Sequence, residues 1–196
     1  YLEVLPVTRE GARHRLGGDE DDAVDWAVRM RRIPEEVLMR SLFDRGELGE
    51  GHLDAVAGLL ARFHGRAERS ERIDAFGTLE SFKVNTDENF NQTEPYVGTT
   101  LSRETFERIR GWTDTFYREE GGLFEARIRE GRIRDCHGDL HMEHVCFLDP
   151  VAAIDCIEFN DRFRYSDTLA DIAFLLMDLE FRGGEGAAAA LWARYA

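Results

Sequence analysis

The chain has 196 residues, of which 43% are hydrophobic, enough to bury the core of one domain or at most two. Acidic residues outnumber Lys and Arg by 39 to 25, and the resulting net charge of −14 argues against a nucleic-acid or anionic-membrane partner. No apolar run approaches the ~20 residues that a membrane span requires, and no signal peptide is recognisable, so we expect a cytoplasmic protein.

The first part of the chain, residues 1–33, has the alternation typical of a β-hairpin. Strands are expected at residues 1–7 and 24–32, and in the second of these apolar side chains alternate with polar ones, as in a half-buried strand. The stretch between them, residues 11–22, is charged and contains glycine, which predicts a loop. The hairpin is expected to end where Pro34 follows.

From Pro34 onwards the periodicity is helical. A buried stripe is predicted from the spacing of Leu53, Val56, Ala57, Leu60 and Phe63. Residues 81–100 are polar, which predicts a long loop whose amides could contact substrate hydroxyls. Further helices are expected at residues 100–119 and 168–181, with an amphipathic piece at residues 123–133.

A loop rich in titratable groups, residues 137–144, precedes two short apolar segments within residues 145–155. A proline turn separates these segments, so we expect them to pair as a small hairpin. The hairpin would bring Asp139, in the loop, close to Asp155, at the end of the second segment. Magnesium-dependent phosphoryl transfer uses two such carboxylates, one to accept the proton of the attacking hydroxyl and one to hold the metal. The pattern therefore predicts a phosphotransferase site.

The same residues resemble a known superfamily. The run from His137 to His141, His-Gly-Asp-Leu-His, resembles the catalytic loop of the aminoglycoside phosphotransferases, which are small-molecule relatives of protein kinases. Asp155 stands where that superfamily has its metal-binding aspartate. Residues 156–165 and 171–174 resemble one bacterial branch, whose members often carry a C-terminal P-loop domain. The resemblance extends, more weakly, over nearly the whole chain.

This resemblance implies an α+β fold of the protein-kinase-like type. Residues 1–33 would be the last hairpin and the hinge of the small N-terminal lobe, with Met30, Arg31 and Ile33 contacting the nucleotide. Residues 34–196 would form the mostly helical C-terminal lobe, which contains the catalytic loop and the metal-binding hairpin.

The resemblance also implies ATP and Mg²⁺ as cofactors, and transfer of the γ-phosphoryl group to a hydroxyl of a small molecule. Asp139 would be the general base, and His141, where protein kinases have a lysine, could offset charge on the transferred group. Asp155 would bind the metal, while Glu158 and Asp161 are candidate substrate contacts.

Two residues outside the loop bear on the site. Asp171 lies within the apolar stripe of the helix at residues 168–181, where a carboxylate needs partners to offset its desolvation. The resemblance implies that it braces the catalytic loop. His64, near the end of an earlier helix, is expected to cap or pack rather than to bind a ligand.

One position departs from the superfamily pattern. The superfamily has an asparagine five residues after the base as a second metal ligand, and this chain has His144 there. Imidazole is a poorer ligand for Mg²⁺ than for Mn²⁺ or zinc, so Mn²⁺ is the alternative cofactor. The loop also admits a transition-metal hydrolase that would use a cluster of His137, Asp139, His141, Glu143 and His144. A third alternative is a catalytically inactive, kinase-like binding module.

The lysine that holds the nucleotide phosphates in kinases of this fold has no counterpart here. The only lysine, Lys83, lies well after the hinge and inside the helical lobe. We therefore expect a fragment, inactive by itself, whose remaining small-lobe strands and glycine-rich loop precede Tyr1. In the full-length protein the partners would be this adjoining small lobe and, as in the bacterial branch, a P-loop domain.

Overall fold

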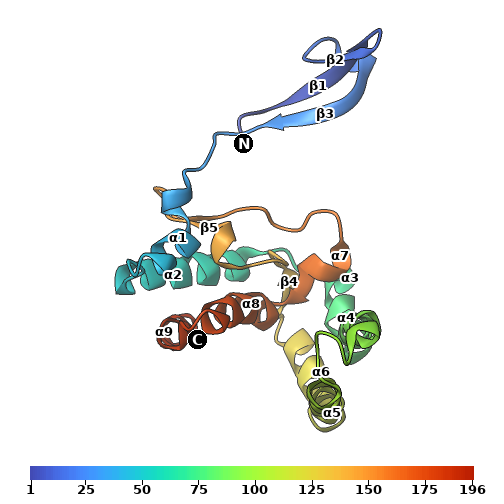
Figure 1. Cartoon of the computed structure of the whole chain (residues 1–196), viewed down its shortest axis with the longest axis vertical. Coiled ribbons are helices and arrows are strands. Elements are labelled where there is room, and N and C mark those ends of the chain that lie inside the picture. Colours follow the sequence, from blue (N-terminus) through green and yellow to red (C-terminus); the bar gives the residue numbers. More distant parts are fainter. The chain divides into compact units, whose positions relative to one another are not determined.

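The computed structural model describes residues 1–196 and divides them into two compact units, Tyr1–Glu36 and Val37–Ala196 (Figure 1). The sequence placed the boundary after Ile33. Helices make up most of the second unit, and each of the three sheets has only two or three strands, so the chain is of the predicted α+β class.

The first unit is a three-stranded antiparallel sheet in the order β2-β1-β3. Its strands are β1 (Glu3–Glu10), β2 (Arg13–Leu16) and β3 (Ala23–Arg29). Pairing of β1 with β3 confirms the predicted hairpin. The prediction of a loop throughout residues 11–22 was wrong, because β2 forms there. Gly11 has a φ of 62° in the two-residue turn between β1 and β2, and this left-handed conformation suits a tight hairpin.

The alternating apolar side chains of the second predicted strand were expected to pack on one covered face, but each of them is 50–59% exposed. The residues concerned are Val24, Trp26, Val28 and Met30. In this small sheet only Pro6 and Thr8, on the central strand β1, are buried.

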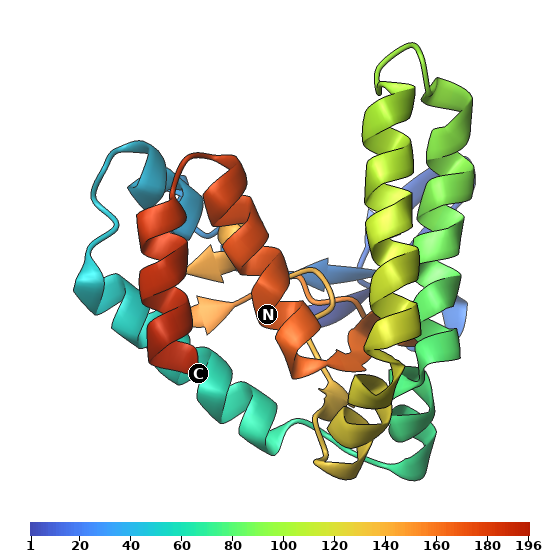
Figure 2. The same cartoon turned by 90° about the horizontal axis from the view of Figure 1, so that it is seen from below.

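In the second unit, helices α2 (Glu50–Arg66), α8 (Thr168–Phe181) and α9 (Glu185–Tyr195) lie side by side (Figure 2). The bounds of α8 agree with the prediction. The predicted stripe of α2 is buried except for Phe63, which is 38% exposed. Fully buried side chains from the predicted catalytic loop pack into the same core, so the core fixes the position of the loop. The core includes Leu53, Val56, Leu60, Leu140, Met142, Val145, Ile172, Leu175, Leu179 and Leu191.

The polar segment expected to be a loop is instead helix α4 (Leu79–Thr93). Thr78 caps it, because its side-chain oxygen accepts a hydrogen bond of 3.2 Å from the N–H of Ser81. Helix α5 (Arg103–Glu119) was predicted, and Ser102 is its N-cap.

Aromatic contacts hold α4 in place. Phe82 packs edge-on against Phe124, with ring centroids 5.2 Å apart, and Phe90 packs in the same way against Phe106, at 5.6 Å. Figure 2 shows α4 and α5 as an antiparallel pair. These contacts offset the weak helix propensity of the asparagines and threonines in α4.

The remaining elements are short. The strands β4 (Ile133–Asp135) and β7 (Tyr165–Asp167) pair antiparallel and lead into and out of the predicted catalytic segment. The pairing of β5 (Val145–Cys146) with β6 (Ala152–Ala153) confirms the expected small hairpin. The remaining α-helices are α1 (Met39–Asp44), α3 (Glu71–Asp74), α6 (Gly121–Arg129) and α7 (Asp161–Arg164), and the 3-10 helices are η1 (Glu20–Asp22), η2 (Glu35–Val37), η3 (Ala75–Gly77), η4 (Glu94–Tyr96) and η5 (Met142–His144).

None of the helices combines the length and the apolar composition that crossing a membrane would need.

Candidate active site

The backbone of the predicted catalytic loop is bound by Asp171, a buried residue of α8. One carboxylate oxygen accepts a hydrogen bond of 3.1 Å from the N–H of His137, and the other accepts one of 2.9 Å from the N–H of Gly138. The imidazole Nε2 of His64 lies 2.9 Å from the first of these oxygens, and its Nδ1 lies 2.7 Å from the hydroxyl of Tyr195. Three donors therefore satisfy the buried carboxylate. His64 is a buried partner of the loop rather than a helix cap.

Gly138 is required by the close approach of another segment. Its φ is 81°, in the left-handed region, and a Cβ at this position would lie 2.9 Å from the carbonyl oxygen of Phe163. Any larger residue would push the loop away from α7.

His137 is a structural member of the loop. Its Nε2 donates to the carbonyl oxygen of Ile154 at 2.8 Å, so its Nδ1 is free to accept from the N–H of Asp139 at 3.4 Å. Burial lowers the pKa of His137, although the Ile154 carbonyl acts in the opposite direction. Both ring nitrogens of this neutral imidazole are occupied, which leaves no lone pair for a metal ion.

The backbone of Asp139 is fixed at both of its polar groups. His137 accepts from its N–H, and Nδ1 of His144 donates to its carbonyl oxygen at 2.8 Å. The carboxylate of Asp139 accepts no hydrogen bond, and the side chain is 38% exposed. A rigid backbone thus presents a carboxylate whose oxygens are free.

His144 connects this carboxylate with that of Asp155. Its Nδ1 lies 3.7 Å from Oδ2 of Asp139, and its Nε2 lies 3.5 Å from Oδ2 of Asp155. The two carboxylates therefore contact different nitrogens of the same ring, as close together as the sequence predicted.

The hydrogen bond to the Asp139 carbonyl places a hydrogen on Nδ1 of His144, because a carbonyl can only accept. In the neutral ring Nε2 is then a lone pair that faces the carboxylate of Asp155. Two acceptors at this distance attract each other only when a proton or a cation lies between them. This donor set fits a divalent cation.

Asp155 is held in an uncommon backbone conformation, with a φ of 61°. Hydrogen bonds of 2.9 Å fix the chain on either side of it, from Ile154 N–H to the His144 carbonyl and from Ile157 N–H to the His137 carbonyl. Its side chain is 81% exposed. The loop and the hairpin together hold an accessible carboxylate beside His144.

His141 completes a compact group. Its Nε2 lies 3.7 Å from Oδ2 of Asp139, and its ring centroid lies 3.9 Å from that of His144. One ligand atom from each of these three residues lies within 4.8 Å of the others. Glu143 is exposed and lies outside this compact group, and both nitrogens of His137 are occupied, so the predicted five-residue cluster is reduced to three residues.

Asp178 also supports the loop, and the sequence analysis did not identify it. It is buried, accepts a hydrogen bond of 3.0 Å from the N–H of Met142, and pairs with Arg182 at 2.8 Å. Burial alone would raise the pKa of Asp178, but these two interactions bring it below its ordinary value. A signal was present in the sequence, since Asp178 lies two turns after Asp171 on the same face of α8.

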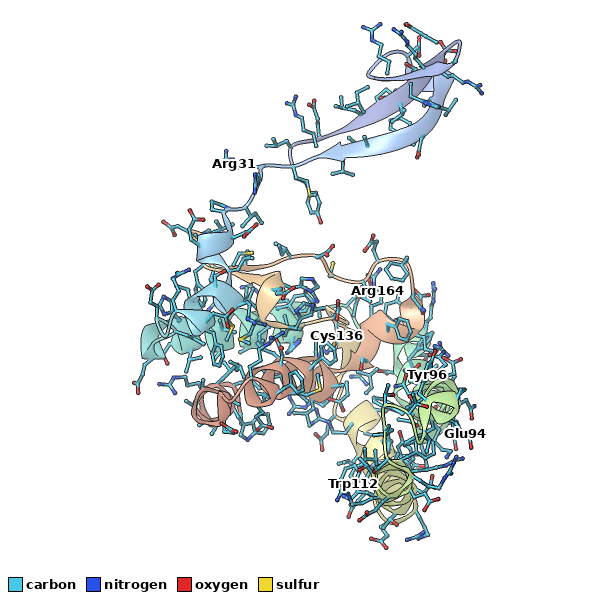
Figure 3. All side chains as sticks on the ribbon, in the orientation of Figure 1. Arg31, Glu94, Tyr96, Trp112, Cys136 and Arg164 are labelled. Carbon is cyan, nitrogen blue, oxygen red and sulfur yellow. The ribbon has the colours of Figure 1, made fainter.

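Of the other predicted site residues, Glu158 and Asp161 make no hydrogen bond or ion pair with this group. Asp161 is ion-paired with Arg72, and Glu158 lines a cavity of about 380 Å³ that His137, Leu140 and residues of α2 also line. Met30, Arg31 and Ile33 belong to the first unit. Cys136, which directly precedes His137 and is labelled in Figure 3, is buried. Nucleotide binding by Met30, Arg31 and Ile33, and substrate binding by Glu158 and Asp161, stay predictions.

Comparison with known proteins identifies the family of this chain. The sequence profile of the phosphotransferase enzyme family matches residues 12–196. Over 157 residues, 80% of its length, the chain is 39% identical to uncharacterized proteins of Mycobacterium bovis and Mycobacterium tuberculosis. It spans 32% of the length of these relatives. The family match confirms the resemblance seen in the sequence and implies a protein-kinase-like fold. The chain belongs to the phosphotransferase enzyme family.

Proposed function

We propose that this protein transfers the γ-phosphoryl group of ATP to a hydroxyl group of a small molecule. The observation that carries the proposal is the state of Asp139. Its backbone is fixed at both polar groups while its carboxylate accepts no hydrogen bond. A general base needs this combination, because its position must be set and its lone pairs must stay available for the substrate proton.

Each residue of the group then has a distinct role. Asp139 accepts the proton of the attacking hydroxyl, and His141, 3.7 Å away, offsets negative charge on the transferred group. Asp155 and His144 would hold Mg²⁺, or Mn²⁺, which supplies charge neutralisation at the nucleotide phosphates when bound. Asp171 keeps the loop in place through the backbone N–H groups of its first two residues.

Nucleotide and substrate contacts complete the proposal. Met30, Arg31 and Ile33 contact the nucleotide, while Glu158 and Asp161 contact the substrate. The single lysine, Lys83, lies on α4, where it pairs with Asp87. We therefore assign the phosphate-binding lysine to a part of the complete protein outside residues 1–196.

The experiment that tests the proposal uses the complete protein. It would be incubated with γ-labelled ATP, Mg²⁺ or Mn²⁺, and pools of hydroxyl-bearing small molecules. Transfer of label into an organic product is the expected result. Nucleotide binding with no transfer to any pool would instead identify a kinase-like binding module.

A second candidate function rests on the group formed by Asp139, His141 and His144, whose ligand atoms lie within 4.8 Å of one another. Such a group could bind a transition metal in a hydrolase. His137, whose nitrogens are both occupied, and Glu143, which lies outside this group, are no longer among its five predicted members. Stoichiometric zinc in the purified protein, together with hydrolysis that needs no nucleotide, would favour this alternative.

A further inference from the structure

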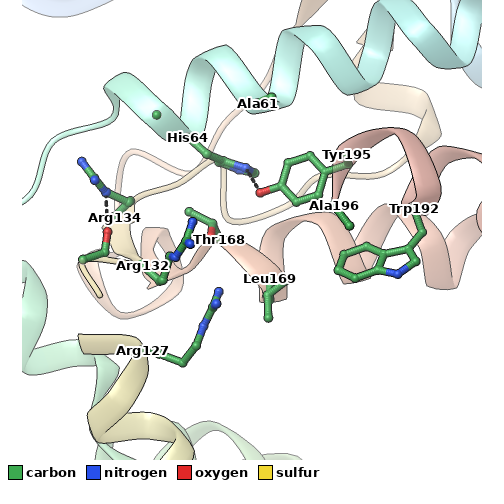
Figure 4. Close-up of a pocket in the computed structure, with 12 residues that line it drawn as sticks. Ala61, His64, Arg127, Arg132, Arg134, Thr168, Leu169, Trp192, Tyr195 and Ala196 are labelled. Carbon is green, nitrogen blue, oxygen red and sulfur yellow. Dashed lines mark hydrogen bonds between the residues drawn. The ribbon is translucent and has the colours of Figure 1, made fainter. Parts of the chain in front are cut away.

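A cavity of about 420 Å³ lies among α2, the turn between α6 and β4, and the helices α8 and α9 (Figure 4). Twelve residues line it, and none of them belongs to the group around Asp139. Three are arginines, Arg127, Arg132 and Arg134, and none is Asp or Glu. This composition is opposite to that of the chain, in which acidic residues outnumber basic ones by 39 to 25.

One of the three guanidinium groups, that of Arg134, has no carboxylate partner. Arg127 is neutralised by Asp167 through hydrogen bonds of 2.6 and 2.5 Å. Arg134 is partly buried and has no ion pair, since its Nε and Nη1 donate only to backbone carbonyls. Arg132 pairs with Glu130 at 3.6 Å, and its side chain is 55% exposed. The partly buried charge of Arg134 is therefore the one left without a counter-ion, and an anionic ligand beside Arg132 and Arg134 would supply it.

The cavity also contains hydroxyl and aromatic groups. Tyr195 and Thr168 contribute hydroxyls, and Trp192, 40% exposed, contributes the face of an indole ring. In Figure 4 the side chains of Arg127 and Arg132 extend toward Thr168. Guanidinium groups match the acceptor oxygens of a phosphate group.

Hydrogen bonds connect the cavity with the catalytic loop. The hydroxyl of Tyr195 bonds to Nδ1 of His64, as the dashed line in Figure 4 shows, and Nε2 of His64 bonds to Asp171. Asp171 in turn binds the N–H groups of His137 and Gly138. A ligand that orders Tyr195 would therefore reduce opening of this chain of hydrogen bonds at the loop.

We propose that this cavity is an anion site that binds a phosphate group, free or carried on a metabolite, and that the bound anion stabilises the catalytic loop. The site is separate from the catalytic group. Its occupancy is measurable as binding, whether or not the phosphotransferase reaction proposed above is found.

The test is calorimetric titration of the complete protein with inorganic phosphate at constant ionic strength. Arg132→Gln should weaken binding by about tenfold or more, the effect of one charge-assisted hydrogen bond. Arg134→Gln should do the same, but it also removes hydrogen bonds to the backbone, so Arg132→Gln is the decisive variant. Arg129→Gln is the matched control, because this arginine of α6 is 70% exposed, pairs with Glu125 and lies outside the cavity.

Two further titrations locate the bound phosphate and identify its source. Binding should persist in Asp155→Ala, which alters the catalytic group only. Tighter binding of phenyl phosphate than of inorganic phosphate would indicate an organic phosphate that packs on Trp192, and equal binding would indicate the free ion. Phosphate should also slow amide exchange at His137 and Gly138 in the wild type. Absence of binding, or equal binding by wild type and Arg132→Gln, would overturn the proposal.

Discussion

The substitution Asp171→Asn tests the support of the catalytic loop. Both carboxylate oxygens of Asp171 accept hydrogen bonds, from His137 N–H and from Gly138 N–H, and His64 contacts one of them. Asparagine has one acceptor oxygen and one NH₂ group. In either orientation of the amide, one backbone N–H would face another donor in a buried site.

The expected magnitude follows from these contacts. An unsatisfied buried donor costs about 1–3 kcal/mol, and the interaction of His64 with a charged acceptor is worth a similar amount. Loss of both predicts a decrease of about 2–6 kcal/mol in the free energy of unfolding. That is a large part of the free energy of unfolding of a typical folded domain, which is roughly 5–15 kcal/mol.

Urea unfolding followed by circular dichroism would measure this decrease, with Asp114→Asn as the control. Asp114 is an exposed carboxylate on α5 that makes no hydrogen bond or ion pair. Hydrogen exchange would locate the effect, because the amides of His137 and Gly138 should exchange at least about tenfold faster in Asp171→Asn. Wild-type stability and exchange in that variant would show that Asp171 does not support the loop.

Three further predictions concern other parts of the second unit. The pKa of Asp178 is lower in the folded chain than its unfolded value of ~3.9, so its stabilisation is complete above that pH and is lost as pH falls through the folded pKa. Urea unfolding should therefore find Asp178→Asn, which loses the pair with Arg182, less stable by about 1–2 kcal/mol at pH 7, and the difference should shrink below pH ~4. In the native protein a thiol reagent should modify only Cys156, because the other two thiols are buried and burial raises their pKa; modification of a second thiol without unfolding would contradict this. His144→Asn should shift the metal preference of the complete enzyme from Mn²⁺ toward Mg²⁺, and an unchanged preference would exclude His144 as a ligand.

The segment that packs against Asp171, residues 137–144, and helix α8 could be located in the sequence because their information is local. The sequence from His137 to His141 carries the motif, and the apolar spacing of residues 168–181 determines a helix whatever surrounds it. The pairing of β5 with β6 followed from two apolar segments around a proline turn.

Helix α4 was not predictable from local pattern. Asn85, Asn89 and Asn91 are weak helix formers, and the contacts that stabilise the helix come from α5 and α6, far along the chain. The same limit applies to the role of His64, because its partners, Asp171 and Tyr195, lie more than a hundred residues away in sequence. Tertiary contacts of this range leave no periodic signal.

The account depends most on the assignment of Asp139 as the base of a phosphoryl transfer. Its most direct test compares the turnover of Asp139→Asn and Glu143→Gln in the complete protein, with ATP, the divalent metal and a hydroxyl substrate from the screen. Glu143 is the matched control, an exposed carboxylate in the same loop with no hydrogen bond or ion pair. The account predicts that kcat falls by roughly 10²–10⁴-fold in Asp139→Asn, and stays near the wild-type value in Glu143→Gln. Equal turnover of Asp139→Asn and wild type would contradict it.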